Sequence, residues 1–131
     1  MKRRTTASRR SSAPDSTTAP TLTAAQASAL EIYDTTLRDG AQAEDVSFSV
    51  EDKLRVAQQL DELGVHFIEG GWPGANPKDI EFFRQIKTMP FRNATVVAFG
   101  STRKASNPVR KDKNLQALLD SGTQTITLYK K

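Results

Sequence analysis

The sequence predicts an α/β fold, the N-terminal part of a TIM (β/α)₈ barrel with about four βα units, on three observations. Apolar segments begin near residues 31, 65, 94 and 125, a spacing of about 30 residues that is typical of βα units. Segments with helical apolar spacing lie between them, and charged residues follow their ends, as at the ligand-binding edge of a parallel sheet. The same spacing fits a doubly wound sheet, which is the alternative. A complete barrel needs about 250 residues, so we expect this chain of 131 residues to be cut short.

The first 28 residues differ in composition from the rest. They are rich in Ser, Thr, Ala and Arg and carry five basic residues against one acidic residue, whereas residues 29–131 carry 14 of each. We expect a disordered basic leader over residues 1–28, because it has too few large apolar side chains to offset its ordering entropy. An organelle transit peptide and a tail for nucleic acid or a membrane surface are the alternatives. The neutral remainder, residues 29–131, is expected to be a partial catalytic barrel without a nucleic-acid-binding face.

Composition excludes other classes. The chain has no cysteine, which excludes disulfides and thiolate zinc sites and fits a cytoplasmic protein. No apolar run approaches the ~20 residues that span a membrane, so no membrane partner is expected.

The first strand, near Ile32 and Tyr33, leads into the adjacent pair Arg38-Asp39 and then Gly40. A carboxylate is a hard oxygen ligand for a divalent cation, and a guanidinium can hold a developing oxyanion without losing its proton. The pair is therefore a candidate site, and the alternative is a structural ion pair or a solvated turn.

Three amphipathic helices follow from capping signals and apolar spacing. Ser49 and Asp52 form a capping-box pattern, and Gly64 marks the C-terminal end of that helix. Asn76-Pro77 starts the second helix, and the third ends near Gly122. The apolar faces are predicted to contain Val50, Leu54, Ala57, Leu60 and Leu63 in the first helix, Ile80, Phe83 and Ile86 in the second, and Leu115, Leu118 and Leu119 in the third.

The remaining strands are expected at residues 65–69, 94–99 and 125–129. The second would end in Glu69, and a loop containing residues 100–103 would follow the third. In a barrel, Arg38, Asp39, Glu69 and that loop share one rim. Asp39 and Glu69 are too few to hold a divalent cation alone, so further ligands must come from outside this chain or from water.

Two other residues receive structural interpretations. His66 is the only histidine, with no second ligand at metal-binding spacing, and is expected to be a packed or surface imidazole. Trp72, in a Gly-Pro loop, is expected to close the mouth of the barrel rather than bind a ligand.

The motifs DTTLRDGAQ, FSVEDKLRVAQQLDELGVHFIEGGWPGANPKDIEFF and VAFGSTRK resemble the start of one superfamily of metal-dependent barrels. It contains α-isopropylmalate synthase, homocitrate synthase and hydroxymethylglutaryl-CoA lyase, and the resemblance over residues 31–129 is strongest to its citramalate synthase branch. The resemblance implies catalytic roles for Arg38, which would stabilise an enolate or alkoxide oxygen, and for Glu69, which would support Arg38 and the metal site. It further implies that Asp39 ligates the metal and that Arg38 and Gln42 bind substrate.

The reaction implied by the resemblance is a Claisen-type condensation of acetyl-CoA with a 2-oxo acid, assisted by a divalent metal (Mg, Mn or Zn). The loop GGWP favours pyruvate as acceptor, giving citramalate for isoleucine and leucine biosynthesis. The alternatives are 2-isopropylmalate or homocitrate synthase, and a non-catalytic truncated barrel that docks on a partner. The expected partners are small molecules, and the full-length protein is expected to be a homodimer. The superfamily's later His-x-His metal motif is absent from this sequence, so this chain alone is expected to be inactive.

Overall fold

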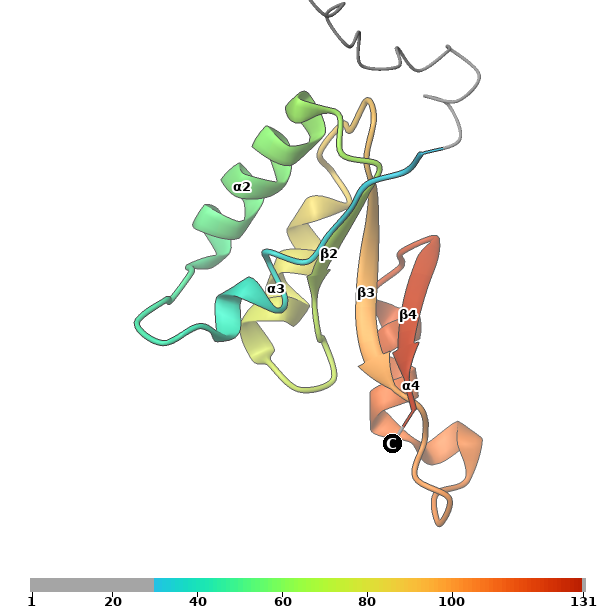
Figure 1. The fold of residues 1–131 in the computed structure, drawn as a ribbon. Helices are drawn as coiled ribbons and strands as arrows, with labels where there is room; N and C mark the ends of the chain where they lie inside the picture. The colour runs from blue at the N-terminus through green and yellow to red at the C-terminus, as the bar shows by residue number, and fades with distance from the viewer. Residues whose placement is uncertain (1–29, 131) are drawn as a thin grey trace, which may run out of the picture.

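The computed structural model describes residues 30–130, so the predictions for residues 1–28 lie outside the described residues. The described part alternates strands and helices (Figure 1). The strands are β1 (Tyr33–Asp34), β2 (Phe67–Gly71), β3 (Thr95–Ser101) and β4 (Thr125–Tyr129). The helices are α2 (Val50–Leu63), α3 (Pro77–Ile86) and α4 (Lys113–Asp120), with short 3₁₀ turns η1 (Gly40–Gln42) and η2 (Val109–Lys111).

The four strands form one parallel sheet in the order β1-β2-β3-β4. A doubly wound sheet reverses its strand order at a switch point, and residues 30–130 contain no such reversal. Right-handed crossovers between sequential parallel strands place every helix on the same face. This order confirms the α/β prediction and favours the barrel over the doubly wound alternative.

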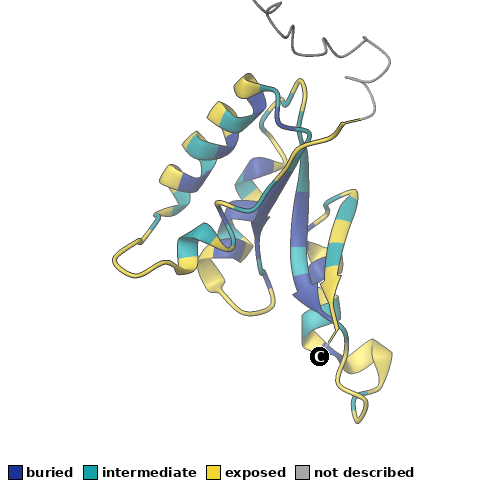
Figure 2. Cartoon of the chain, viewed as in Figure 1, coloured by how far each residue is buried: buried dark blue, intermediate teal, exposed yellow. Residues whose placement is uncertain are grey.

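The hydrophobic core lies between the sheet and its helices, and Figure 2 marks the buried parts of the strands and helices in dark blue. Phe82 and Phe83 of α3 are fully buried and meet edge to face, with ring centroids 5.2 Å apart. They pack against β2, where Gly70 leaves no room for a β-carbon because the Phe82 ring occupies that space. The register of β2 shifts between Glu69 and Gly71, so Gly71 also faces α3, where Asp79 occupies the space of a β-carbon. Glu69 points to the opposite side of the sheet, here called the open face, where it contacts Arg38 and Tyr33.

Helix α2 begins and ends where the sequence predicts. The Ser49 side chain accepts from the Asp52 N–H while Asp52 accepts from the Ser49 N–H, which completes the capping box. Gly64 ends the helix in the left-handed conformation, at φ 89°. The prediction that Leu63 belongs to the apolar face is wrong, because Leu63 is 78% exposed at the last position of the helix.

The predicted inward face of α3 also needs correction. Asn76 caps the helix and Pro77 begins it, as expected. Ile80 is 47% exposed, however, and the residues that point inward are Asp79, Phe82, Phe83 and Ile86. They recur at i, i+3, i+4 and i+7 from Asp79, so a buried carboxylate occupies the position that an apolar residue would usually take.

Smaller corrections concern α4 and the strand ends. Leu119 is 69% exposed, contrary to its predicted place on the apolar face, and α4 ends at Asp120. Strand β2 continues through Gly70 to Gly71, and β3 continues to Ser101, because both remain paired with their neighbours. Glu69 therefore lies within a strand rather than at its end. Strand β4 has the predicted bounds, and no helix within residues 30–130 is long and apolar enough to cross a membrane.

Candidate active site on the open face of the sheet

The turn after β1 is built by its own side chains. The Asp34 carboxylate accepts from the Thr36 N–H at 2.9 Å and from the Thr36 hydroxyl at 3.0 Å. The Thr35 carbonyl accepts from three successive N–H groups, those of residues 38–40. Leu37 is fully buried and anchors the turn in the core. The turn therefore holds Arg38 at the edge of the sheet.

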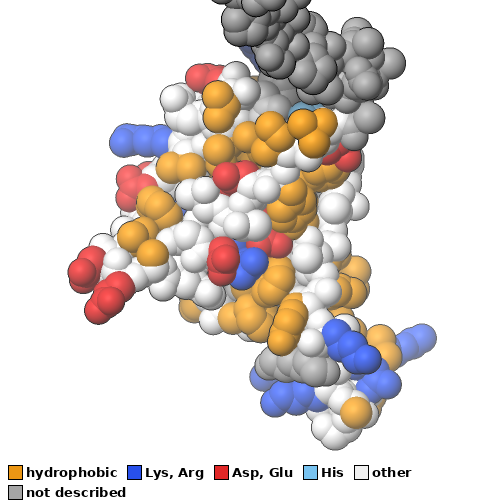
Figure 3. Space-filling model, viewed as in Figure 1, with side chains coloured by type: hydrophobic (Ala, Val, Ile, Leu, Met, Phe, Trp, Pro, Cys, Tyr) orange, Lys and Arg blue, Asp and Glu red, His pale blue; other side chains and the backbone are white. Residues whose placement is uncertain are grey.

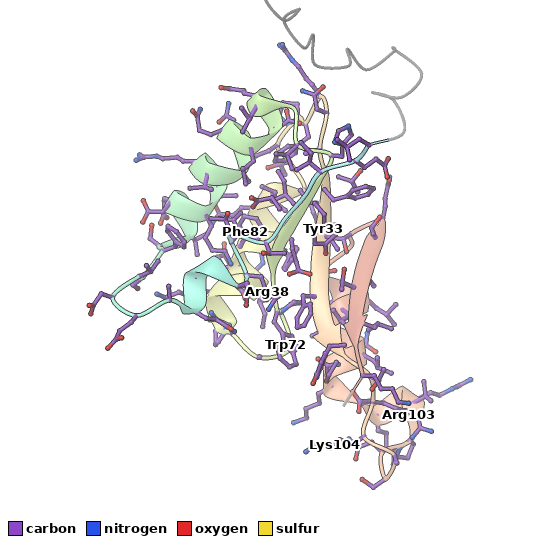
Figure 4. All side chains as sticks on the ribbon, in the orientation of Figure 1. Tyr33, Arg38, Trp72, Phe82, Arg103 and Lys104 are labelled. Carbon is purple, nitrogen blue, oxygen red and sulfur yellow. The ribbon has the colours of Figure 1, made fainter. Side chains whose placement is uncertain are left out.

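Arg38, which is labelled in Figure 4, is held by three contacts. Its Nε donates to Glu69 Oε2 at 2.6 Å, and its Nη1 donates to Asp39 Oδ1 at 3.1 Å. The guanidinium lies over the Phe99 ring, 4.2 Å from the centroid, a cation–π geometry. Nη2 makes no hydrogen bond to any residue between 30 and 130. The structure thus orients the guanidinium and leaves one nitrogen free to donate.

Glu69 is a buried carboxylate with both oxygens engaged. It is 1% exposed. Its Oε2 accepts from Arg38, and its Oε1 accepts from the Tyr33 hydroxyl at 2.7 Å. A buried carboxylate is tolerated when it is paired and hydrogen-bonded. The structure therefore brings together Arg38, Asp39 and Glu69 as the sequence predicts, with Glu69 as the residue that positions Arg38.

Tyr33 is the member of this cluster that sequence reasoning missed. Its hydroxyl also lies 2.6 Å from Thr127 Oγ1 on β4. Burial raises the pKa of Tyr33 to about 12; the bond from Thr127 opposes this shift and the neighbouring Glu69 carboxylate adds to it. Tyr33 is therefore a protonated donor at neutral pH. Two-residue alternation along β1 could have placed its ring on the open face, but nothing local indicates its partners, 36 and 94 residues away.

A cleft of about 170 Å³ adjoins Arg38 and is lined by Gln42 and Trp72 among others. Gln42, the last residue of η1, is exposed and lines the same cleft as Arg38, and its role in substrate binding stays a prediction. The Trp72 ring packs edge to face on Phe99 with centroids 5.4 Å apart, and its Nε1 donates to Asn114 Oδ1 at 2.7 Å. One wall of the cleft is thus fixed against β3 and α4.

Part of the lining of this cleft is a buried ion pair that sequence reasoning also missed. Lys53 of α2 and Asp79 of α3 form it, at 3% and 6% exposure. The second oxygen of Asp79 accepts from the Trp72 N–H at 2.7 Å. The pair therefore fastens two helices and the start of the β2–α3 loop to one another. The sequence signal that could have revealed the pair is Asp79, a charged residue at an inward-facing position of the amphipathic helix α3.

Two further predicted residues have structural roles. His66 Nδ1 accepts from the Ile32 N–H at 3.0 Å, which confirms a packed imidazole. Arg103 does not join the Arg38 cluster, because its Nη1 donates to three carbonyls of its own loop, those of residues 104, 105 and 107. Gly100 and Ser101, expected in that loop, belong to β3.

The carboxylates present fit a divalent metal only as part of a larger ligand set. The Asp39 side chain is 62% exposed, and Oδ2 makes no bond to residues 30–130. Glu69 has no free oxygen. The described residues contain no group of three or more potential metal ligands. Asp39 has an oxygen available for one metal bond, and its assignment as a metal ligand stays a prediction; the remaining ligands must come from other sources.

Comparison with known proteins identifies related chains. (R)-citramalate synthase from Geobacter sulfurreducens is 54% identical over 104 residues, which is 79% of this chain and 20% of that protein. (R)-citramalate synthase from Synechocystis is 54% identical over 108 residues, 82% of this chain and 20% of that protein. 2-Isopropylmalate synthase from Rhodopirellula baltica is more distant, at 49% over 67 residues, 51% of this chain and 12% of that protein. The chain spans about one fifth of the length of these citramalate synthases.

Solved structures support the barrel assignment. Hydroxymethylglutaryl-CoA lyase from Pseudomonas aeruginosa superposes with a TM-score of 0.55 at 26% identity, covering 75% of this chain and 31% of that chain. HMG-CoA lyase from Bacillus subtilis gives the same TM-score at 23% identity and the same coverages, and shows the fold alone. The HMGL-like family model matches residues 29–118. Because this model matches more than half of the chain, and the strands form a sequential parallel sheet, the chain belongs to the HMGL-like family.

Proposed function

We propose that this chain forms the first part of a metal-dependent acyltransferase that condenses acetyl-CoA with a 2-oxo acid. The observation that carries the proposal is the Arg38-Asp39-Glu69 cluster on a chain 54% identical to (R)-citramalate synthases. Because the chain spans about one fifth of those relatives, the activity belongs to a protein that contains the remaining site residues.

In this proposal Arg38 stabilises the negative charge that develops on oxygen during the reaction. The condensation places negative charge first on the enolate oxygen of the acetyl group and then on the alkoxide oxygen of the acceptor. Glu69 and Phe99 fix the guanidinium before reaction, so no reorganisation is needed when that charge develops. The free Nη2 is the donor that would meet the oxygen. Tyr33 keeps Glu69 turned toward Arg38 by holding its other oxygen.

Asp39 would hold the divalent metal as one of several ligands. When bound, the metal polarises the acceptor carbonyl as a Lewis acid. The hydrogen bond from Arg38 Nη1 to Oδ1 leaves Oδ2 available to the metal. Mg, Mn and Zn all remain suited to such a carboxylate, and the rest of the ligand set decides among them.

Pyruvate is the proposed acceptor, which makes citramalate the product. Relatives named (R)-citramalate synthase match 79% and 82% of the chain, whereas the Rhodopirellula baltica 2-isopropylmalate synthase matches 51%. Gln42 and Trp72 line the cleft beside Arg38 and would contact the acceptor. The bulky Trp72 ring there favours a small methyl ketone over a branched one.

A graft tests this proposal. Residues 30–130 replace the matching segment of the Geobacter sulfurreducens (R)-citramalate synthase, which supplies the rest of the protein. Release of CoA thiol from acetyl-CoA is measured with pyruvate, 2-oxoisovalerate and 2-oxoglutarate. We expect turnover with pyruvate, and a loss of about 10²–10³ in kcat for Arg38→Ala, the size typical of one lost oxyanion donor. Arg55→Ala, an exposed site on α2, is the matched control.

The outcomes separate the alternatives. Turnover driven by 2-oxoisovalerate or 2-oxoglutarate in preference to pyruvate would replace citramalate by isopropylmalate or homocitrate as the product. A folded graft that releases no CoA with any acceptor, or that works equally well with Arg38→Ala, would contradict the proposed function.

A further inference from the structure

Positive charge is concentrated in one segment of the described chain. Residues 103–113 carry five basic side chains and one acidic side chain, a net charge of +4. The rest of residues 30–130 carries eight basic and thirteen acidic side chains, a net charge of −5. In Figure 3 the basic side chains gather at one end of the molecule, where the β3–α4 segment lies. Residues 103–113 therefore form a basic segment on a domain that is otherwise acidic.

The segment surrounds a cleft of about 530 Å³, here called the basic cleft and lined by Lys104, Lys111 and Lys113 among others. This volume is within the ~300–1,000 Å³ of small-molecule sites. All three lysines are exposed, and none of their ammonium groups has a partner within residues 30–130. Three like charges around one concavity repel one another unless an anion lies between them.

The wall of the basic cleft is held in place. Arg103 donates to three carbonyls of its own loop, at 3.0 to 3.2 Å. The one carboxylate, Asp112, turns into α4, where it accepts from the N–H groups of Asn114 and Leu115. Bonds from the Leu115 N–H and the Asn107 amide hold the pKa of Asp112 below its usual range. Asp112 therefore caps α4 and does not pair with the lysines that line the basic cleft.

The basic cleft adjoins the Arg38 site. Trp72 lines both clefts, and Gly74 and Asn114 continue the wall beyond it. Figure 4 shows Trp72 between Arg38 on one side and Lys104 on the other. A ligand that fills both clefts would have an uncharged end near Arg38 and a strongly anionic end among the lysines.

We propose that the basic cleft binds the phosphorylated nucleotide end of acetyl-CoA while its acetyl end lies beside Arg38. The inference rests on the proposed function. CoA carries a diphosphate and a 3′-phosphate at one end and an uncharged pantetheine thioester at the other. Lysine ammonium groups bind phosphate as point charges, and the three unpartnered ammonium groups match that end. Trp72 lies where the pantetheine arm passes from one cleft to the other.

Equilibrium binding to the complete chain of 131 residues tests this placement. Trp72 is the only tryptophan, so its fluorescence reports occupancy of either cleft. The ligands are CoA, 3′-dephospho-CoA and pantetheine. We expect CoA to bind more tightly than 3′-dephospho-CoA by several-fold, and pantetheine to bind at least about a hundredfold more weakly, because charge supplies most of the affinity.

The test variant is the triple substitution K104Q/K111Q/K113Q, and its matched control is R55Q/R84Q/R92Q. Both remove three exposed cations, so net charge and any contribution of residues 1–28 stay equal. We expect the test variant to bind CoA about tenfold or more weakly and the control to change affinity less than about twofold. K104R/K111R/K113R should restore binding, and circular dichroism verifies that each variant is folded.

Equal affinity in the test and control variants would overturn the inference, as would a folded wild-type chain that does not bind CoA. A preference for single-stranded RNA over CoA at the lysines would overturn it as well. Failure here is distinguishable from failure of the proposed function, because CoA binding needs no 2-oxo acid. A graft that releases CoA while the lysine variant binds CoA normally would contradict only the inference.

Discussion

At the scale of single residues, the site depends on Glu69 having two partners. A buried carboxylate without them would be costly, since breaking a buried pair by removing one partner destabilises by about 3–5 kcal/mol. Arg38 and Tyr33 satisfy one oxygen each. The same pairing that stabilises the sheet therefore orients the guanidinium, so structural and proposed catalytic roles coincide at this residue.

The Tyr33 hydroxyl should titrate with a pKa of about 12. The Tyr129→Phe variant leaves Tyr33 as the only tyrosine, and tyrosinate absorbance against pH then gives its midpoint. Because the folded-state pKa is raised above the usual value of about 10, the stability that this group contributes is complete below pH 10 and is lost as the pH rises toward 12. A midpoint near 10 in a folded chain would show that the hydroxyl is not buried beside Glu69 as described.

At the scale of elements, one carboxylate ties α2 to the start of β3. Asp61 accepts from the N–H groups of Arg92, Asn93 and Ala94 at 2.7 to 3.2 Å. Burial would raise the pKa of Asp61, but these backbone bonds outweigh it and the pKa falls below its usual range. The bonds fix where β3 enters the sheet and hence where Phe99 lies under Arg38.

Asp61→Asn should lower the free energy of unfolding at pH 7 by about 1–3 kcal/mol. The amide oxygen of Asn is a weaker acceptor than a carboxylate oxygen, and the amide NH₂ group would face a backbone N–H group that now donates to Asp61. The depressed pKa means that the contribution of Asp61 is complete above its unfolded value of about 3.9 and is lost as the pH falls through the folded value. The difference between variant and wild type should therefore shrink below pH 4. Urea unfolding at pH 7 and pH 3 measures it.

Glu62→Gln is the control, since Glu62 is the exposed neighbour of Asp61. Equal effects of the two substitutions at pH 7 would refute the role of Asp61 as a tie between α2 and β3.

Elements whose signals are local could be predicted from the sequence, and those that depend on tertiary packing could not. The capping box at Ser49 and the left-handed Gly64 involve residues a few positions apart, and both predictions were confirmed. Ile80 was wrongly placed inward because apolar spacing cannot reveal that Asp79, paired with Lys53, takes the buried position. Glu69 was placed at a strand end because Gly70 and Gly71 are typical of loops, whereas β2 continues past a register shift to Gly71, which pairs with Ala98 of β3.

At the scale of the whole molecule, the open face of the sheet joins β1 to β4 through side chains alone. Arg38, Glu69, Tyr33 and Thr127 form one hydrogen-bonded chain across it, with Phe99 beneath the guanidinium. Arg38, Asp39 and Glu69 could be selected from the sequence because charges near strand ends meet at one edge of a parallel sheet. Thr127 could not, because only the assembled order of strands brings it to Tyr33.

We expect the chain of 131 residues by itself to release no CoA from acetyl-CoA and pyruvate, and to bind Mn²⁺ only weakly. Within the Arg38-Asp39-Glu69 cluster only Asp39 has a carboxylate oxygen free for a cation, and residues 30–130 contain no group of three or more potential metal ligands, whereas hard cations take six or more ligands. Mn²⁺ titration followed by water proton relaxation should show no saturation at millimolar metal, and Asp39→Asn should behave like the wild type. Saturable Mn²⁺ binding lost in Asp39→Asn, or CoA release lost in Arg38→Ala, would show instead that these residues assemble a working site without the rest of a barrel.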